Sequence, residues 1–131
     1  MCQSGDYMRD EQIFIMAEKE YEMAELLRKL NVSRPVAMAL VCLSNREEVT
    51  SREIEMLSGL RQPEVSIAMR YLNESEWVDI REEKKTEGKG RPIKLYRLVV
   101  ELENIIKNIE DDYLSQSRSM LESIERLKHL S

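Results

Sequence analysis

Apolar side chains recur every three or four residues in the first part of the chain, from about Asp10 to Leu30. This spacing gathers them on one face and predicts an amphipathic helix. The segment from Asn31 to Pro35 then interrupts the pattern, and Ser33 is the expected N-cap of a second helix whose first turn holds Pro35. The expected buried stripe of the first helix is Ile13, Met16, Met23, Leu26, Leu27 and Leu30.

The next segment, Val36–Leu43, consists of apolar residues throughout. A helix that is apolar on all sides is expected to be buried, so we place it at the heart of the domain. Cys42 falls within this run and is expected to be a small core residue. The following stretch, Glu47–Thr50, is short enough to be either a strand with a single partner or a plain linker.

Two short helical patterns follow, separated by a glycine. Residues 50–53, Thr-Ser-Arg-Glu, have the form of a capping box, in which hydroxyl and carboxylate each bind the other residue's amide. They predict a helix from Ser51 to about Leu57 that buries Ile54 and Leu57. Gly59 lies in the expected turn, where it is free to take positive φ.

The helix after this turn is expected to cover about residues 62–73, with Pro63 in its first turn. Its inward stripe is Val65, Met69 and Leu72. A short capped helix, a glycine turn and a second helix match the construction of a helix-turn-helix. An ordinary helical hairpin is the alternative.

Residues 77–81 alternate apolar and polar side chains, which predicts a half-buried strand, and Arg91–Leu98 is expected to return as its partner. The stretch Lys84–Leu98 carries six Lys or Arg and one acid, Glu87, in a protein of net charge −5. A basic hairpin on an acidic protein favours a polyanionic partner. A hairpin kept soluble by its lysines is the alternative.

A long helix is expected from about Val99 to Leu130. Its apolar residues recur at steps of three, four or seven, with Ser117 filling the remaining place. Such a stripe needs a partner, which is the N-terminal helix, the same helix of a second subunit, or both. The residues expected at a dimer interface are Leu102, Ile106, Ile109, Tyr113, Met120, Ile124 and Leu127.

Charge divides the chain in the same way as the apolar pattern. Residues 1–33 hold four basic and seven acidic side chains, residues 34–98 hold twelve and eleven, and residues 99–131 hold four and seven. The expected organisation is therefore a helical extension (1–33), a central domain (34–98) and a C-terminal helix (99–131). The expected fold class is mainly α with a small β-hairpin, α+β.

Several kinds of chemistry find no support in the residues. Neither Cys-x-x-Cys nor His-x-x-x-His spacing occurs, and the one histidine, His129, lies on a charged helix, so no metal site, cofactor or catalytic group is expected. The longest apolar run is far shorter than the roughly 20 residues of a membrane span. The first residues lack the features of a signal peptide, which favours a cytoplasmic protein.

Residues 34–98 resemble the winged-helix domain of prokaryotic, especially archaeal, transcriptional regulators of the broad ArsR, MarR and TrmB group. The segment Leu60–Leu72 resembles their recognition helix, and Gly88–Tyr96 resembles the wing of archaeal members. Metal sensors of the ArsR type often place a cysteine pair in the helix that matches residues 51–57. This sequence has no cysteine there, so metal sensing at that place is not expected.

The resemblance implies that one face of the second helix meets the major groove of DNA. Gln62 would contact adenine, Ser66 would donate or accept, and Arg70 would reach guanine or phosphate. Ile67 would contact a thymine methyl group or simply pack, and Glu64 would accept from cytosine or serve the helix dipole. The expected DNA-contacting residues are Arg61, Gln62, Glu64, Ser66, Ile67, Arg70, Lys84, Lys85, Lys89, Arg91 and Lys94.

Most of the basic residues of the hairpin are expected on phosphates or in the minor groove, because they cannot all reach base edges. In the regulators that the chain resembles, terminal helices commonly form the dimer interface. The resulting hypothesis is a homodimeric regulator that binds double-stranded DNA at a palindromic operator, with half-sites roughly 34 Å apart. The alternative is a winged-helix module that docks protein in a transcription or replication assembly.

Overall fold

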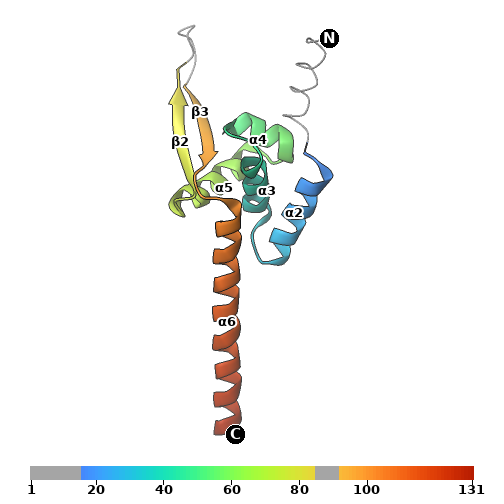
Figure 1. Ribbon diagram of the computed structural model, residues 1–131, viewed down its shortest axis with the longest axis vertical. Helices are drawn as coiled ribbons and strands as arrows, with labels where there is room; N and C mark the ends of the chain where they lie inside the picture. Colours follow the sequence, from blue (N-terminus) through green and yellow to red (C-terminus); the bar gives the residue numbers. More distant parts are fainter. Residues whose placement is uncertain (1–15, 85–91) are drawn as a thin grey trace. The chain divides into compact units, whose positions relative to one another are not determined.

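The computed structural model describes residues 16–84 and 92–131. Its elements from residue 34 to 98 follow the order of a winged helix, with three helices (residues 34–44, 51–58 and 62–74) before a β-hairpin, so the predicted α+β class is confirmed (Figure 1). The chain divides into two compact units, the first ending at Val99 and the second containing the long C-terminal helix. The elements are α2 (Glu18–Lys29), α3 (Arg34–Ser44), β1 (Val49–Thr50), α4 (Ser51–Ser58), α5 (Gln62–Glu74), β2 (Val78–Glu83), β3 (Ile93–Leu98) and α6 (Leu102–Leu130).

Helix α3 forms the centre of the first unit, as its uninterrupted apolar run predicts. Every residue from Val36 to Leu43 is buried, and α2, α4, α5 and β3 all contact this helix. Pro35 lies in its first turn. Cys42 has no exposed surface, and burial raises the pKa of its thiol to about 12, so the sulfur is an uncharged core atom.

Helix α2 turns a different face toward α3 from the one that the apolar pattern predicts. Leu26 and Leu30 are 52% and 40% exposed, so their predicted burial is wrong, whereas Leu27 is buried as predicted and Ala24, which was not predicted, is buried as well. Met16 is buried as predicted, and Met23 is only partly buried. The predicted stripe also included Ile13, which lies outside the described residues. A charged residue, Glu20, occupies the buried face instead.

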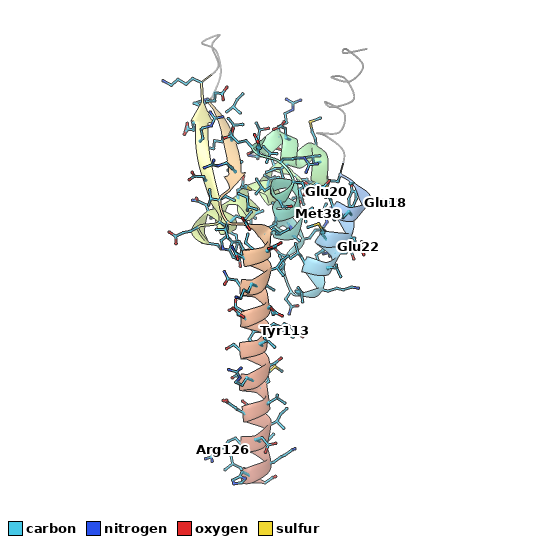
Figure 2. The ribbon with its side chains drawn as sticks, in the orientation of Figure 1. Glu18, Glu20, Glu22, Met38, Tyr113 and Arg126 are labelled. Atoms are coloured by element: carbon cyan, nitrogen blue, oxygen red, sulfur yellow. The ribbon has the colours of Figure 1, made fainter. Side chains whose placement is uncertain are left out.

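Glu20, labelled on α2 in Figure 2, joins this helix to the end of α3 through its carboxylate. Arg46 donates to it at 2.8 Å, Asn45 at 3.1 Å, and the Ala17 backbone amide at 2.9 Å. Burial opposes ionisation of this carboxyl, but the hydrogen bonds from Arg46, Ala17 and Asn45 outweigh burial and lower its pKa. The buried charge is thus fully paired, which explains why it can replace an apolar side chain.

The end of α5 is fixed by a Schellman motif. Glu76 takes positive φ (62°), the Trp77 amide donates to the Leu72 carbonyl at 3.0 Å, and the Tyr71 and Trp77 rings meet edge to face with centroids 6.3 Å apart. The left-handed conformation reverses the chain and starts β2 beside the helix. Asn31 ends α2 in the same conformation (φ 70°).

The three strands form an antiparallel sheet in the order β1-β3-β2, with Tyr96 of β3 between Val49 and Ile80. Residues 49–50 are therefore a strand rather than a linker. The half-buried pattern predicted for β2 is wrong beyond its first residue, because Val78 is buried but Ile80 is 41% exposed. The physical reason is that β2 is the edge strand of a hairpin that extends past the helices (Figure 1), and every β2 residue after Val78 is exposed.

Candidate nucleic-acid interface

The predicted capping box at the start of α4 is confirmed. The Thr50 hydroxyl accepts from the Glu53 amide at 3.1 Å, and the Glu53 carboxylate accepts from the Thr50 amide at 2.8 Å. The helix ends at Gly59, whose φ is 74° and whose amide donates to the Glu55 carbonyl at 2.9 Å. A Cβ at Gly59 would meet no atom within 4 Å, so the backbone conformation, rather than space, favours glycine here.

The turn between α4 and α5 covers residues 58–60, as the sequence predicts, and it is held by the hydroxyl of Ser58. Its buried hydroxyl donates to the Ile54 carbonyl and accepts from the Leu60 amide at 3.1 Å. The Leu60 side chain is buried as well. One hydroxyl therefore links the last turn of α4 to the chain that enters α5, which fixes the angle between these two helices.

We expect Ser58→Ala to lower the free energy of unfolding by about 1–2 kcal/mol, because it leaves the buried Leu60 amide without its acceptor. Urea denaturation followed by circular dichroism measures this loss. The control is Ser66→Ala on the exposed face of α5, which should change stability by less than about 0.5 kcal/mol. Equal effects of the two substitutions would contradict the role given to Ser58.

Helix α5 buries one face in the first unit and exposes the other. Val65, Met69 and Leu72 are buried as predicted, and Ala68 joins them. The side chains predicted to meet DNA, other than Glu64, lie on the exposed part of the helix surface. These exposed residues are Gln62, Ser66, Ile67 and Arg70.

The structure separates the two roles left open for Ile67. Its side chain is 61% exposed, so it is not packed against the described part of the chain. Tyr71, one position from Arg70, is also 51% exposed. Within residues 16–84 and 92–131, no hydrogen bond or ion pair engages the side chains of Gln62, Ser66 or Arg70. This face of α5 is thus free to meet another molecule.

The first turn of α5 is built around Glu64. Its carboxylate accepts from the Arg61 amide at 3.0 Å and lies 3.7 Å from the Arg34 guanidinium. The Glu64 side chain is partly exposed and caps the helix, and it does not lie among the most exposed side chains of α5. Arg34, at the start of α3, thereby reaches the N-terminal end of α5. No local pattern predicts the contact between Arg34 and Glu64, because the two residues lie thirty positions apart and meet only through packing of α3 on α5.

The described part of the hairpin is less basic than its sequence suggests. Arg81 donates to Glu48 at 2.9 and 2.7 Å and to Glu83 at 3.1 Å. These bonds lower the pKa of the Glu48 carboxyl. Arg97 lies 3.6 Å from Asp79 on the neighbouring strand. Two of the hairpin's cations are therefore already paired with carboxylates of the same chain.

Two of the predicted wing lysines lie within the described residues. Lys84 follows β2, and Lys94 lies on β3 in register with Glu82; both side chains are exposed. The other predicted wing contacts, Lys85, Lys89 and Arg91, lie outside the described residues. The hairpin is attached to the helix-turn-helix through Tyr96, which is buried and accepts from the Ser51 hydroxyl at 3.3 Å.

The second unit, α6, carries the predicted apolar stripe along most of its 29 residues. Ile106, Tyr113, Met120, Ile124 and Leu127 are between 44% and 69% exposed. Leu102 and Ile109 are partly buried, and Ile105, which was not predicted, is fully buried. Leu114 and Leu121 widen the exposed stripe on one side.

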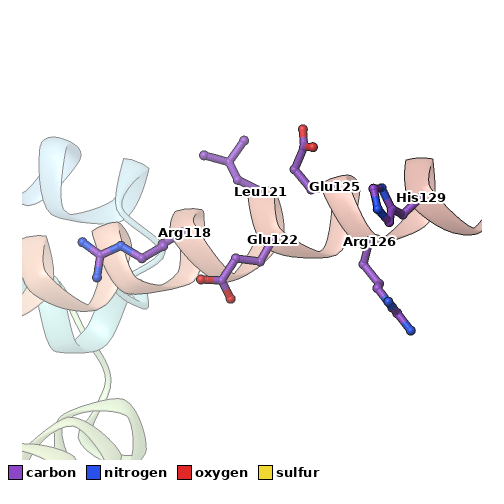
Figure 3. A pocket seen from close by; sticks show the side chains of 6 residues that line it. All are labelled: Arg118, Leu121, Glu122, Glu125, Arg126 and His129. Atoms are coloured by element: carbon purple, nitrogen blue, oxygen red, sulfur yellow. The ribbon is translucent and has the colours of Figure 1, made fainter.

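Surface hollows of the described structure include a groove in the first unit and a shallow depression on α6. A groove of about 310 Å³ lies where α2, α3 and α4 meet, with Tyr21, Met38 and Ser58 in its lining. A shallow hollow on α6 is lined by charged side chains of both signs and Leu121 (Figure 3). Among the described residues, no group of three or more His, Cys, Asp or Glu is placed to hold a metal ion. No described helix is long and apolar enough to cross a membrane.

The chain was compared with known proteins by sequence and by structure. No protein-family model matches the chain, and no curated protein matches it by sequence. Among solved structures, the chain is similar to TrmBL2, described as an archaeal chromatin protein with a novel mode of DNA binding. The TM-score is 0.63 at 22% identity, and the match covers 84% of this chain and 40% of TrmBL2. This likeness supports the winged-helix fold.

Proposed function

We propose that this chain is a transcriptional regulator that binds double-stranded DNA sequence-specifically as a homodimer. The observation that carries the proposal is the exposed face of α5, whose polar side chains have no partner within the described residues. The capping box, Gly59 and Ser58 hold this helix in a fixed position. A rigid helix with a solvated polar face suits the major groove of DNA. TrmBL2, which shares the fold, is itself a DNA-binding protein.

Each side chain on this face has a distinct part in the proposed complex. Arg70 makes a bidentate contact to guanine or binds a phosphate, and Gln62 contacts adenine. Ile67 is exposed, which favours contact with a thymine methyl group. Glu64 caps the helix, so we assign it no base. Lys84 and Lys94 bind phosphates and orient the helix without reading sequence.

The test is a titration of duplex DNA selected from genomic fragments, comparing the native protein with Arg70→Ala. A bidentate contact to a base is worth about 1–3 kcal/mol, so we expect a loss of affinity of roughly 10-fold or more. The matched control is Arg28→Ala, which removes an exposed arginine of α2 that pairs with Glu25 at 3.6 Å. This control should retain native affinity. Absence of duplex binding by the native protein at low salt would refute the proposal.

A protein-docking role for the same surface is the second candidate function. The exposed Ile67 and Tyr71 side chains favour it, because apolar and aromatic groups are common at protein interfaces. The titration separates the two functions, since a protein-docking module would not bind duplex DNA in a manner that depends on Arg70.

A further inference from the structure

The exposed stripe of α6 has nearly the same spacing from either end. Its positions 102, 106, 109, 113, 117, 120, 124 and 127 are centred on Leu114 and Ser115 to within half a residue. If two copies lie antiparallel, Ile106 of one therefore faces Ile124 of the other, and Leu102 faces Leu127. A stripe of this kind can form a seam in either orientation, so spacing alone does not choose between them.

Charge distinguishes the two orientations. From Glu101 to Tyr113, the chain carries five acids and one base, a net charge of −4. From Leu114 to Ser131, it carries two acids and three bases, a net charge of +1 with His129 neutral. A parallel pair would place the two acidic halves side by side, whereas an antiparallel pair places each acidic half against a basic half.

Side-chain size favours the same orientation. In the middle of the stripe, a large residue, Tyr113, is followed one turn later by a small one, Ser117. A parallel pair would bring the two tyrosines together in one layer and leave the two serines in the next. In an antiparallel pair each tyrosine faces the serine of the other copy, so both layers have similar volume.

We propose that the apolar stripe of α6 is covered by α6 of a second copy of this chain in antiparallel orientation. This inference rests on the homodimer of the proposed function and specifies its geometry. Beside the seam, Glu103 of one copy meets Lys128 of the other. The Lys128–Glu125 contact within one helix, at 3.7 Å, is highly exposed and therefore weak, so Lys128 can exchange this partner for Glu103 of the second copy.

The orientation decides how far apart the two winged-helix units are attached. Each unit joins α6 at its N-terminal end, and a helix of 29 residues is about 44 Å long. An antiparallel pair holds the two attachment points about 40 Å apart, near opposite ends of the helix pair. A parallel pair would hold them about 10 Å apart, the usual distance between packed helices.

Cysteine cross-linking tests the orientation. Ile106→Cys and Ile124→Cys are made separately in a Cys2→Ser chain, and oxidised alone or after mixing and subunit exchange. Cys42 is buried with a raised thiol pKa, so it does not compete. We expect cross-linked dimer in the mixture and little from either variant alone. Ser115→Cys, on the opposite face of the helix, is the control and should not cross-link.

The outcomes separate this inference from the proposed function. Cross-linking of each single variant with itself would show a parallel pair and overturn the inference while the homodimer stands. A dimer that cross-links in no sample would place the interface elsewhere and also overturn it. A monomer in sedimentation would remove both the antiparallel pair and the homodimer, and the Arg70→Ala titration reports on DNA binding independently.

Discussion

Replacement of Glu20 by glutamine is expected to lower the free energy of unfolding of the first unit by about 2 kcal/mol at neutral pH. The glutamine has the same shape, but it leaves the Arg46 guanidinium beside a neutral amide. The Arg46 side chain is itself only 15% exposed. Removing one partner of a buried ion pair lowers stability by more than the intact pair contributes, because the other charge stays buried without a partner. Urea denaturation at pH 7 measures the loss.

The effect of Glu20→Gln should depend on pH. The folded state lowers the pKa of this carboxyl from its ordinary value of 4.5, so its contribution is present above that value. It is lost as the pH falls through the lowered folded pKa. The difference in unfolding free energy between the native chain and the variant should therefore be full at pH 7 and shrink below about pH 4.5.

Glu25→Gln provides the matched control on the same helix. Glu25 pairs with Arg28 at 3.6 Å, but both side chains are about half exposed or more, and such pairs contribute little. We expect a change below about 0.5 kcal/mol. A Glu20→Gln variant as stable as this control would show that the network around Arg46 does not hold α2 on α3.

The second large effect is expected for Ile124→Asp. Ile124 is 47% exposed on α6, and a carboxylate in the apolar seam of a dimer would have to be buried without a partner. The variant should be monomeric in sedimentation at micromolar concentration. Most helical stability in proteins comes from packing of an amphipathic face, so the helical circular dichroism of α6 should also fall when its stripe loses its partner.

Loss of the dimer should weaken DNA binding about 100-fold or more, because two linked binding units gain roughly that much from their effective concentration. Ser115→Asp adds the same charge to the polar face of the same helix and should leave assembly and affinity unchanged. A dimeric Ile124→Asp protein would refute the role of the stripe. A monomer with native DNA affinity would refute the need for a dimer.

Local chemistry made most of the first unit predictable. The Thr50–Glu53 capping box, the glycine turn at Gly59 and the buried run of α3 are each fixed by residues close together in the sequence, and all are confirmed. The inward stripe of α5 also follows from helical spacing alone. The residues that face outward on α5 were predicted by the same argument, because the buried face determines the exposed one.

The predictions of burial fail where contacts between residues far apart in the sequence determine which side chains are covered. The pattern assigned Leu26 and Leu30 to the core because a carboxylate such as Glu20 is normally solvated. Only the folded chain brings Arg46, twenty-six positions away, beside it. Ile80 was expected to be half buried because apolar and polar residues alternate around it. Alternation indicates which residues share a face of a strand, but not whether anything covers that face. The pairing of Glu48 with Arg81 across the sheet has no local signal either.

The ion pairs of the hairpin bear on how the proposed DNA complex should respond to salt. A cation releases counterions from DNA only when it newly neutralises a phosphate, at roughly 0.9 in the log–log slope for each contact. Arg81 and Arg97 already have carboxylate partners and would have to exchange them, which leaves the local charge almost unchanged. The slope of affinity against salt should therefore count the cations that have no carboxylate partner among the described residues, such as Arg70 and Lys84, and fall short of the number of basic residues near the DNA.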